Sequence, residues 1–85
     1  MLNEDLFAKA LGRFLRLRRL EQDQTLEKLA SIAHINDKNL GRIERGEKIP
    51  KAHTLFQIVM ALNLTNTTFN KILKEYESLK KEENM

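Results

Sequence analysis

The sequence lacks cysteine, internal repeats and the alternating pattern typical of β-strands. Without cysteine it can form neither a disulfide framework nor a thiolate metal site, which suits a reducing cytoplasm. No apolar run approaches the ~20 residues that cross a bilayer, and the N-terminal MLNEDLFAK is acidic where a signal peptide would be basic. We therefore expect a soluble, cytoplasmic protein that has no membrane partner.

Side chains that support catalysis or metal binding are also scarce. The only serines are Ser31 and Ser78, and the two histidines, His34 and His53, have no recognisable catalytic partners or shared ligand set. The sequence has no glycine-rich phosphate loop. We expect no catalytic residues, no metal site, no cofactor and no enzymatic activity.

The composition fits one small domain spanning residues 1–85, because 41% of the residues are hydrophobic and 32% are charged. The net charge of +3 is unevenly distributed. Residues 9–51 carry eleven lysines and arginines against six acidic residues, whereas residues 52–85 are neutral. On charge alone, a nucleic-acid partner and an ordinary solvated surface explain this basic half equally well.

Apolar residues recur at intervals of three and four along most of the chain, which predicts an all-α fold of five compactly packed helices. The first helix is expected over about residues 4–21, with Asn3 or Asp5 as its N-cap. Thr25 is a suitable N-cap for a short second helix.

The next two predicted helices also have marked ends. Asn36 can cap a third helix that runs to Arg45 and is stopped by Gly46. A fourth helix lies between Pro50, which ends any helical pattern, and Asn63, a plausible C-cap.

The fifth helix is expected over about residues 66–80. Thr65 is its predicted N-cap, and we expect Lys80 to Met85 to fray.

At 100° per residue, the third predicted helix has one apolar side and one basic side. Leu40, Ile43 and Glu44 share the first side. The outward side holds Lys38, Gly41, Arg42 and Arg45. Lysine and arginine can donate to guanine O6 and N7, and asparagine can pair with adenine, so this helix has the side chains that major-groove recognition requires. From charge alone, a solvated surface helix has about the same weight.

The segment from Leu11 to Leu64 resembles the phage-repressor family of helix-turn-helix domains, which is also called lambda-repressor-like, Cro or Xre type. The landmarks in register are Arg19 ten residues before Leu29, the pair Leu29 and Ala30, the block from Ile43 to Gly46, and then Pro50, Leu55 and Leu62. The resemblance implies a five-helix DNA-binding domain whose helix-turn-helix covers about residues 25–45, with the third helix as the reader.

The resemblance also implies roles for individual residues. The family's base-reading positions fall on Asp37, Lys38, Asn39 and Arg42. Its phosphate-contacting positions fall near Thr25 and Leu26, and around Arg45 to Lys48. Its buried ion pair falls on Arg19 and Glu44, for which we favour a structural role because a buried carboxylate needs such a partner.

Three positions depart from the family pattern. Leu26 stands where the family often has a phosphate-binding glutamine, so this contact is expected to be lost. His34 stands at the turn position often held by glycine and must tolerate a left-handed backbone. Asp37 repels phosphate, and its alternative roles are to favour the helix N-terminus by its charge, to orient Lys38 or Arg42, or to accept a hydrogen bond from cytosine N4. We rank the first role highest and keep the base contact as a minority option. In the first helix, Arg16 is a further candidate phosphate contact, with a solvated role as an equal alternative.

The two ends of the chain carry more apolar residues than one small domain can bury. We expect some of them to form a two-fold homodimer that reads an inverted-repeat operator, and the alternative is that the fifth helix folds back over the first and fourth. The candidate interface residues are Phe56, Met60, Phe69, Ile72, Leu73, Tyr76 and Leu79.

These features predict a DNA-binding transcriptional regulator, whose action as a repressor or an activator the residues do not decide. By the habit of the family, we expect a small regulator of a mobile genetic element. The competing hypothesis is a module of the antitoxin type that binds a protein partner through its apolar ends. The basic side of the third helix favours double-stranded DNA as the partner.

Overall fold

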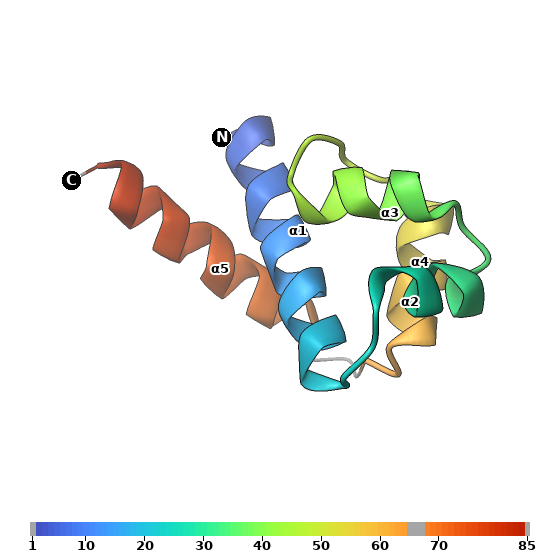
Figure 1. The fold of residues 1–85 in the computed structure, drawn as a ribbon. Coiled ribbons are helices and arrows are strands. Elements are labelled where there is room, and N and C mark those ends of the chain that lie inside the picture. Colours follow the sequence, from blue (N-terminus) through green and yellow to red (C-terminus); the bar gives the residue numbers. More distant parts are fainter. Residues whose placement is uncertain (1, 65–67, 85) are drawn as a thin grey trace.

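The computed structural model describes residues 2–64 and 68–84. Its five helices are α1 (Glu4–Glu21), α2 (Leu26–Ala33), α3 (Asp37–Glu44), α4 (Ala52–Ala61) and α5 (Thr68–Glu83). The described residues contain no strand, and the predicted all-α class is confirmed (Figure 1). The predicted N-cap Thr65 lies outside the described residues. No described helix combines the length and apolar character needed to cross a membrane.

The first three helices begin at side-chain caps. Asn3 accepts a hydrogen bond from the Leu6 amide, so it is Asn3 and not Asp5 that caps α1. Thr25 and Asn36 cap α2 and α3 in the same way, with Asn36 accepting from the amides of both Lys38 and Asn39. These local bonds satisfy backbone donors that have no partner within the helix.

Left-handed residues follow the ends of α2, α3 and α4. They are His34 (φ 58°), Gly46 (φ 75°) and Asn63 (φ 53°). The helix α3 ends at Glu44, one residue before the predicted Arg45, which is its C-cap. These turns bring the following segments back across the molecule.

The last helix is longer than predicted. We expected Lys80 to Met85 to fray, but α5 continues to Glu83, and the Asn84 amide donates to the carbonyl oxygens of Lys80 and Lys81 at 3.2 Å. The helical hydrogen bonds therefore continue through most of the segment that was expected to fray, of which Met85 lies outside the described residues.

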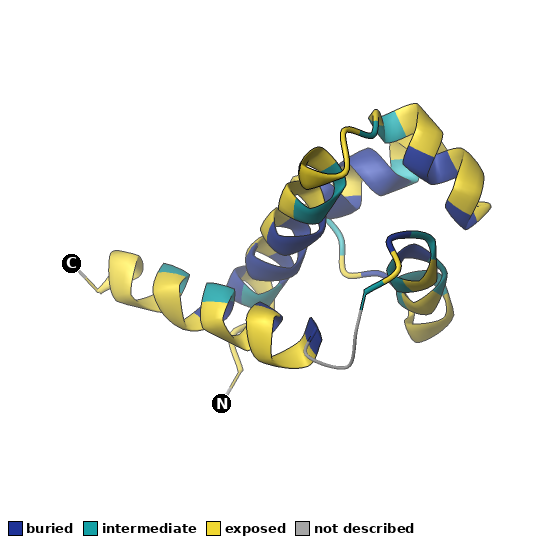
Figure 2. Cartoon of the chain, turned by 90° about the horizontal axis from the view of Figure 1, so that it is seen from below, coloured by how far each residue is buried: buried dark blue, intermediate teal, exposed yellow. Residues whose placement is uncertain are grey.

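The main core is formed where α1 crosses the other helices. It contains Leu11, Phe14, Leu15, Leu29, Ala30, Ala33, Leu40, Ile43, Ile58, Leu62 and Ile72. Figure 2 shows a nearly continuous buried face along α1, whereas α5 is mostly exposed. The helix-turn-helix and the last helix therefore both pack against α1.

The helix α5 lies along α1 (Figure 1). Tyr76 packs with Leu6 and Ala10, and its hydroxyl accepts a hydrogen bond from the Asn3 amide at 3.0 Å. The last helix therefore folds back over α1, as in the alternative to the dimer that the sequence left open.

Candidate nucleic-acid interface

The helices α2 and α3 are joined by a short turn whose geometry depends on His34. This residue adopts a left-handed conformation (φ 58°, ψ 43°), as the turn position requires. The Ile35 amide then donates to the Ala30 carbonyl oxygen at 3.0 Å, and Asn36 starts α3. Because α2 packs against both α3 and α4, the third helix is held at a fixed angle on the surface.

The outward side of α3 is cationic. Leu40 and Ile43 are fully buried, whereas Lys38, Arg42 and Arg45 are exposed. Among the described residues, the side chains of Lys38 and Arg42 make no hydrogen bond or ion pair. These two cations are therefore available to an external partner.

Gly41 does not lie open on this surface, as the helical spacing alone had suggested. It is buried, because the Arg45 guanidinium and Leu26 cover it. A Cβ atom at Gly41 would lie 3.1 Å from Arg45 Nη1 and 3.4 Å from the Leu26 side chain. The glycine thus forms the floor of a hollow.

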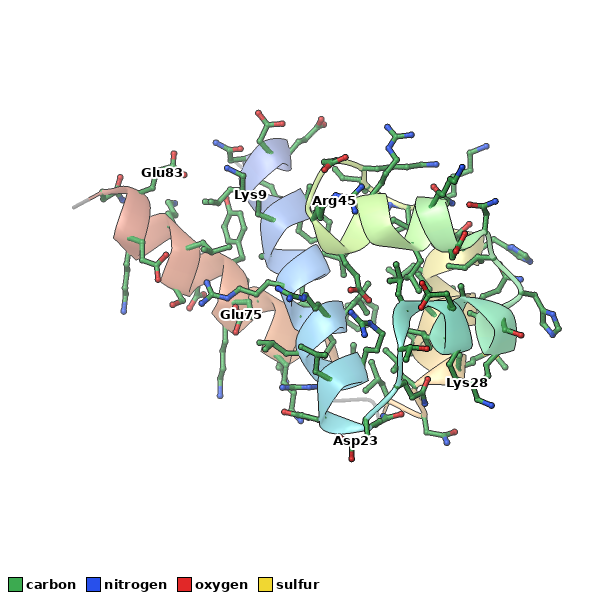
Figure 3. The ribbon with its side chains drawn as sticks, viewed as in Figure 1. Lys9, Asp23, Lys28, Arg45, Glu75 and Glu83 are labelled. Carbon is green, nitrogen blue, oxygen red and sulfur yellow. The ribbon has the colours of Figure 1, made fainter. Side chains whose placement is uncertain are left out.

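Two shallow hollows meet over Gly41. The first, of about 370 Å³, is lined by Leu26, Asp37, Lys38, Gly41, Arg42 and Arg45. The second, of about 390 Å³, is lined by Arg16, Arg19, Leu26, Gly41, Glu44 and Arg45. The structure therefore brings Arg16, from α1, to the same surface as Arg45, and Figure 3 shows Arg45 at the end of α3 that faces α1.

Arg45 has a partner within its own turn. Its Nε donates to a Glu47 carboxylate oxygen at 2.7 Å, and both side chains are exposed. This hydrogen bond raises the pKa of Arg45 and lowers the pKa of Glu47. The positive charges of Arg45 and Arg42 also lower the pKa of Glu47. A phosphate that binds Arg45 must compete with this carboxylate.

Asn39 and Lys48 are also bonded to each other. Lys48 Nζ donates to Asn39 Oδ1 at 2.7 Å, and both residues are half-buried. Asn39 is not among the residues that line the two hollows. The four predicted base-reading residues therefore differ in their surroundings: Asp37, Lys38 and Arg42 line the first hollow, whereas Asn39 lies outside it and is bonded to Lys48.

Thr25 is exposed at the start of α2, where its Oγ1 accepts from the Lys28 amide at 3.1 Å. The neighbouring Leu26 packs against the core and lines both hollows. The beginning of α2 thus contributes the side chain of Leu26 to the two hollows, whereas Thr25 lines neither of them.

The Arg19 and Glu44 side chains form a two-bond ion pair beneath this surface. Arg19 Nε and Nη2 donate to the two Glu44 carboxylate oxygens at 2.8 Å and 2.9 Å, and Arg19 Nη1 donates to the Gln24 carbonyl oxygen at 2.8 Å. The hydrogen bond to Glu44 raises the pKa of Arg19. Only 4% of the Glu44 side chain is exposed, so the pair ties α1 to α3 rather than facing a ligand.

A residue that the sequence interpretation missed is Gly12. A Cβ atom there would clash with the carbonyl oxygens of Ile43 and Glu44, the latter at 2.7 Å. A glycine in the middle of a predicted helix is the available signal, because it costs helix stability unless close packing requires it. Gly12 lets α1 approach the end of α3.

The described residues offer no group of three or more histidine, aspartate or glutamate side chains that could hold a metal ion. His34 and His53 are exposed and lie on different elements.

The seven candidate interface residues do not share one surface. Ile72 and Tyr76 are 5% and 7% exposed and pack within the chain, so the structure corrects their assignment to an interface. Leu79 is half-buried. The remaining four, Phe56, Met60, Phe69 and Leu73, are between 50% and 74% exposed.

An apolar groove separates α4 from α5. It has a volume of about 550 Å³ and is lined by Ala52, Leu55, Phe56, Val59, Leu64, Thr68, Phe69 and Ile72. The fold-back of α5 therefore covers α1 but leaves much of the facing surface of α4 uncovered.

The fold resembles solved structures of transcriptional regulators. The clp gene regulator ClgR from Corynebacterium glutamicum has a TM-score of 0.84 and 24% identity, over 92% of this chain and 84% of that chain. An HTH_3 family transcriptional regulator from Vibrio cholerae has a TM-score of 0.73 and 27% identity, over 79% of this chain and 38% of that chain. A single-substitution variant of the restriction-modification controller protein C.Esp1396I has a TM-score of 0.76 and 23% identity, over 81% and 89% of the two chains.

Comparison with curated protein sequences gives no significant match. A family model described as a helix-turn-helix domain matches residues 10–70, which is more than two thirds of the chain and includes α2, α3 and α4. The predicted family is thereby confirmed. The chain belongs to the helix-turn-helix domain family and has the fold of transcriptional regulators.

Proposed function

We propose that the protein is a transcriptional regulator that binds double-stranded DNA sequence-specifically, with α3 in the major groove. The observation that carries this proposal is the exposed side of α3, where Lys38 and Arg42 are unpaired and aligned beside Arg45. A helix of this kind, capped at its N-terminus and supported by a second helix, is the element that helix-turn-helix proteins insert into the groove.

We assign base reading to Lys38 and Arg42, with Asn39 beside them and Asp37 at the N-terminus of the helix. Lysine and arginine donate to guanine O6 and N7. The carboxylate of Asp37 interacts favourably with the positive end of the helix dipole. We rank its other role, accepting a hydrogen bond from cytosine N4, below this one.

We assign phosphate contacts to Arg16, Thr25, Arg45 and Lys48. Arg16 and Arg45 line the second hollow, which joins α1, α2 and α3, and Thr25 directly precedes Leu26, which also lines it. Such contacts fix the orientation of the protein on DNA and carry no sequence information directly. They make the affinity fall with salt concentration.

We also propose that two copies associate through the exposed apolar residues of α4 and α5. Phe56 and Phe69 lie on the two sides of the apolar groove, and exposed apolar surface of this kind is typical of interfaces. A two-fold dimer would place its reading helices about 34 Å apart and select half-sites roughly 10 bp apart.

The selection of bound duplexes from a random DNA library at about 0.15 M salt tests both parts of the proposal, because nonspecific phosphate binding is partly suppressed there. We expect an inverted repeat with the spacing given above. A single half-site would support DNA reading without the dimer. Recovery of no motif by folded protein would contradict DNA reading and favour the antitoxin-like alternative, in which the groove between α4 and α5 holds a protein partner.

A further inference from the structure

The bond between Lys48 and Asn39 connects the loop after α3 to the reading helix. The donor is the Lys48 ammonium group and the acceptor is Asn39 Oδ1, at 2.7 Å. None of the ion pairs among the described residues includes Lys48, so this amide oxygen is the partner of its charge. Charge-assisted hydrogen bonds are shorter and stronger than neutral ones.

Both ends of this contact are held in place by other bonds. Asn39 lies in the first turn of α3, where its backbone amide donates to the Asn36 cap. The loop that carries Lys48 is fixed by the left-handed Gly46, whose amide donates to the Ile43 carbonyl oxygen at 3.0 Å, and by the buried Pro50. The contact is therefore part of the folded framework of the reading helix.

The chemistry of the contact determines which way the Asn39 amide faces. An ammonium group has only donors, so it must face the carboxamide oxygen, and the NH₂ group is turned away from it. Asn39 Nδ2 donates no hydrogen bond to another described residue. The bidentate contact of asparagine with adenine needs both the oxygen and the nitrogen, whereas guanine offers two acceptors in the major groove.

We propose that Lys48 is a positioning residue that sets the base preference of Asn39. Lys48 takes one of the two lone pairs of Oδ1 and holds this oxygen towards the loop, which favours Asn39 as a hydrogen-bond donor and therefore the acceptor edge of guanine over the mixed edge of adenine. The inference rests on the proposed function and assigns Lys48 a role in specificity in addition to a phosphate contact.

Selections from the random library with four proteins test this assignment: the wild type, Asn39→Ala, Lys48→Met and Lys51→Met. Comparison of the motif selected by Asn39→Ala with the wild-type motif locates the base that Asn39 reads, because the variant loses the base preference at that position. Lys51→Met removes the same charge from an exposed lysine that makes no side-chain cap or ion pair, and it is the matched control. Methionine retains much of the apolar stem of the half-buried lysine, and circular dichroism verifies the fold of each variant.

At the base that Asn39 reads, we expect Lys48→Met to raise the preference for adenine relative to guanine on the order of tenfold. The preferences at other positions should match those of the wild type and of Lys51→Met. The double variant Asn39→Ala/Lys48→Met should select the same motif as Asn39→Ala, because Lys48 acts through Asn39.

An unchanged motif for Lys48→Met, with affinity reduced equally on all sequences, would overturn the positioning role and leave the proposed function standing. A shift that persists in the double variant would also overturn it, since Lys48 would then contact a base itself. If the folded wild-type protein selects no motif, the proposed function fails and the assignment fails with it.

Discussion

At the residue scale, the cationic side chains of α3 and of the residues that follow it differ in their hydrogen-bond partners within the chain. Lys38 and Arg42 make no side-chain hydrogen bond or ion pair within the described chain, whereas Arg45 is paired with Glu47 and Lys48 with Asn39. A cationic side chain without a partner in the chain binds the edge of a base without first breaking an intramolecular bond. We therefore place sequence reading on Lys38 and Arg42 and expect the paired cations to depend on their partners.

Replacing Arg42 by alanine should relax sequence preference. Loss of a base contact costs about 1–3 kcal/mol on the selected sequence and much less on random DNA. Dissociation constants on both duplexes measure the difference. Lys28→Ala, which removes a charge from an exposed position on α2, is the control that should keep the ratio of the two constants. Equal losses on both duplexes for Arg42→Ala would show that another residue reads the sequence.

Replacing Glu47 by glutamine should strengthen DNA binding a few-fold on all sequences alike, because it removes a carboxylate that competes with phosphate for Arg45. The measurement is the affinity for random duplex across a range of salt concentrations. Glu83→Gln makes the same change in charge at the far end of α5 and serves as the control (Figure 3). Equal effects of both variants would mean that only the net charge matters.

At the scale of elements, the beginnings of α1, α2 and α3 were predictable from the sequence because each is fixed by a local bond. Asn3, Thr25 and Asn36 each cap an amide two or three residues ahead, so the signal is contained in a few consecutive residues. The length of α5 was underestimated, because its continuation to Glu83 is not marked by a capping residue in the sequence.

Features that depend on side chains from different turns were not predictable in this way. The helical spacing placed Gly41 outward, but it did not indicate that Arg45 folds over it. The bond between Asn39 and Lys48 spans nine residues and a loop, which no helical period describes. The Arg19 and Glu44 pairing came from a family resemblance, and the structure supplies its bidentate geometry.

The packing of α1 against α3 gives a prediction at this scale. Gly12→Ala should destabilise the protein by about 1–3 kcal/mol, although alanine favours a helix, because the new methyl group meets the backbone of Ile43 and Glu44. Urea unfolding measures the free energy of unfolding. Gly41→Ala, where the nearest atoms belong to flexible side chains, should be tolerated far better. A gain in stability for Gly12→Ala would mean that α1 and α3 are further apart.

At the scale of the whole molecule, the main question is how the apolar surface of α4 and α5 is covered. The sequence could not decide between a fold-back and a dimer, because both bury the same apolar stripe. The structure divides the stripe: Ile72 and Tyr76 face the interior, whereas Phe69 and Leu73 are exposed. Fold-back and association are therefore compatible, since packing on α1 leaves Phe69 and Leu73 of the same apolar stripe exposed.

The dimer is tested by comparing Phe69→Glu with Asn70→Glu. Both positions are exposed on α5, so neither change should affect the fold of one chain, but only Phe69 lines the apolar groove. We expect the wild type and Asn70→Glu to sediment as dimers at tens of micromolar and Phe69→Glu as a monomer. A monomeric wild type under these conditions would count heavily against association through this surface, although dimers could still form on DNA.

If α3 reads sequence, the protein must distinguish its selected duplex from other DNA, and the ratio of two dissociation constants measures this discrimination. The purified protein is titrated at about 0.15 M salt with its selected duplex and with a scrambled duplex of equal length and composition. Our account predicts that the selected duplex binds at least ~10³ times more tightly, as expected for specific recognition. A ratio near one, measured with folded protein, would show that the cationic surface binds DNA only through phosphate and would contradict the account.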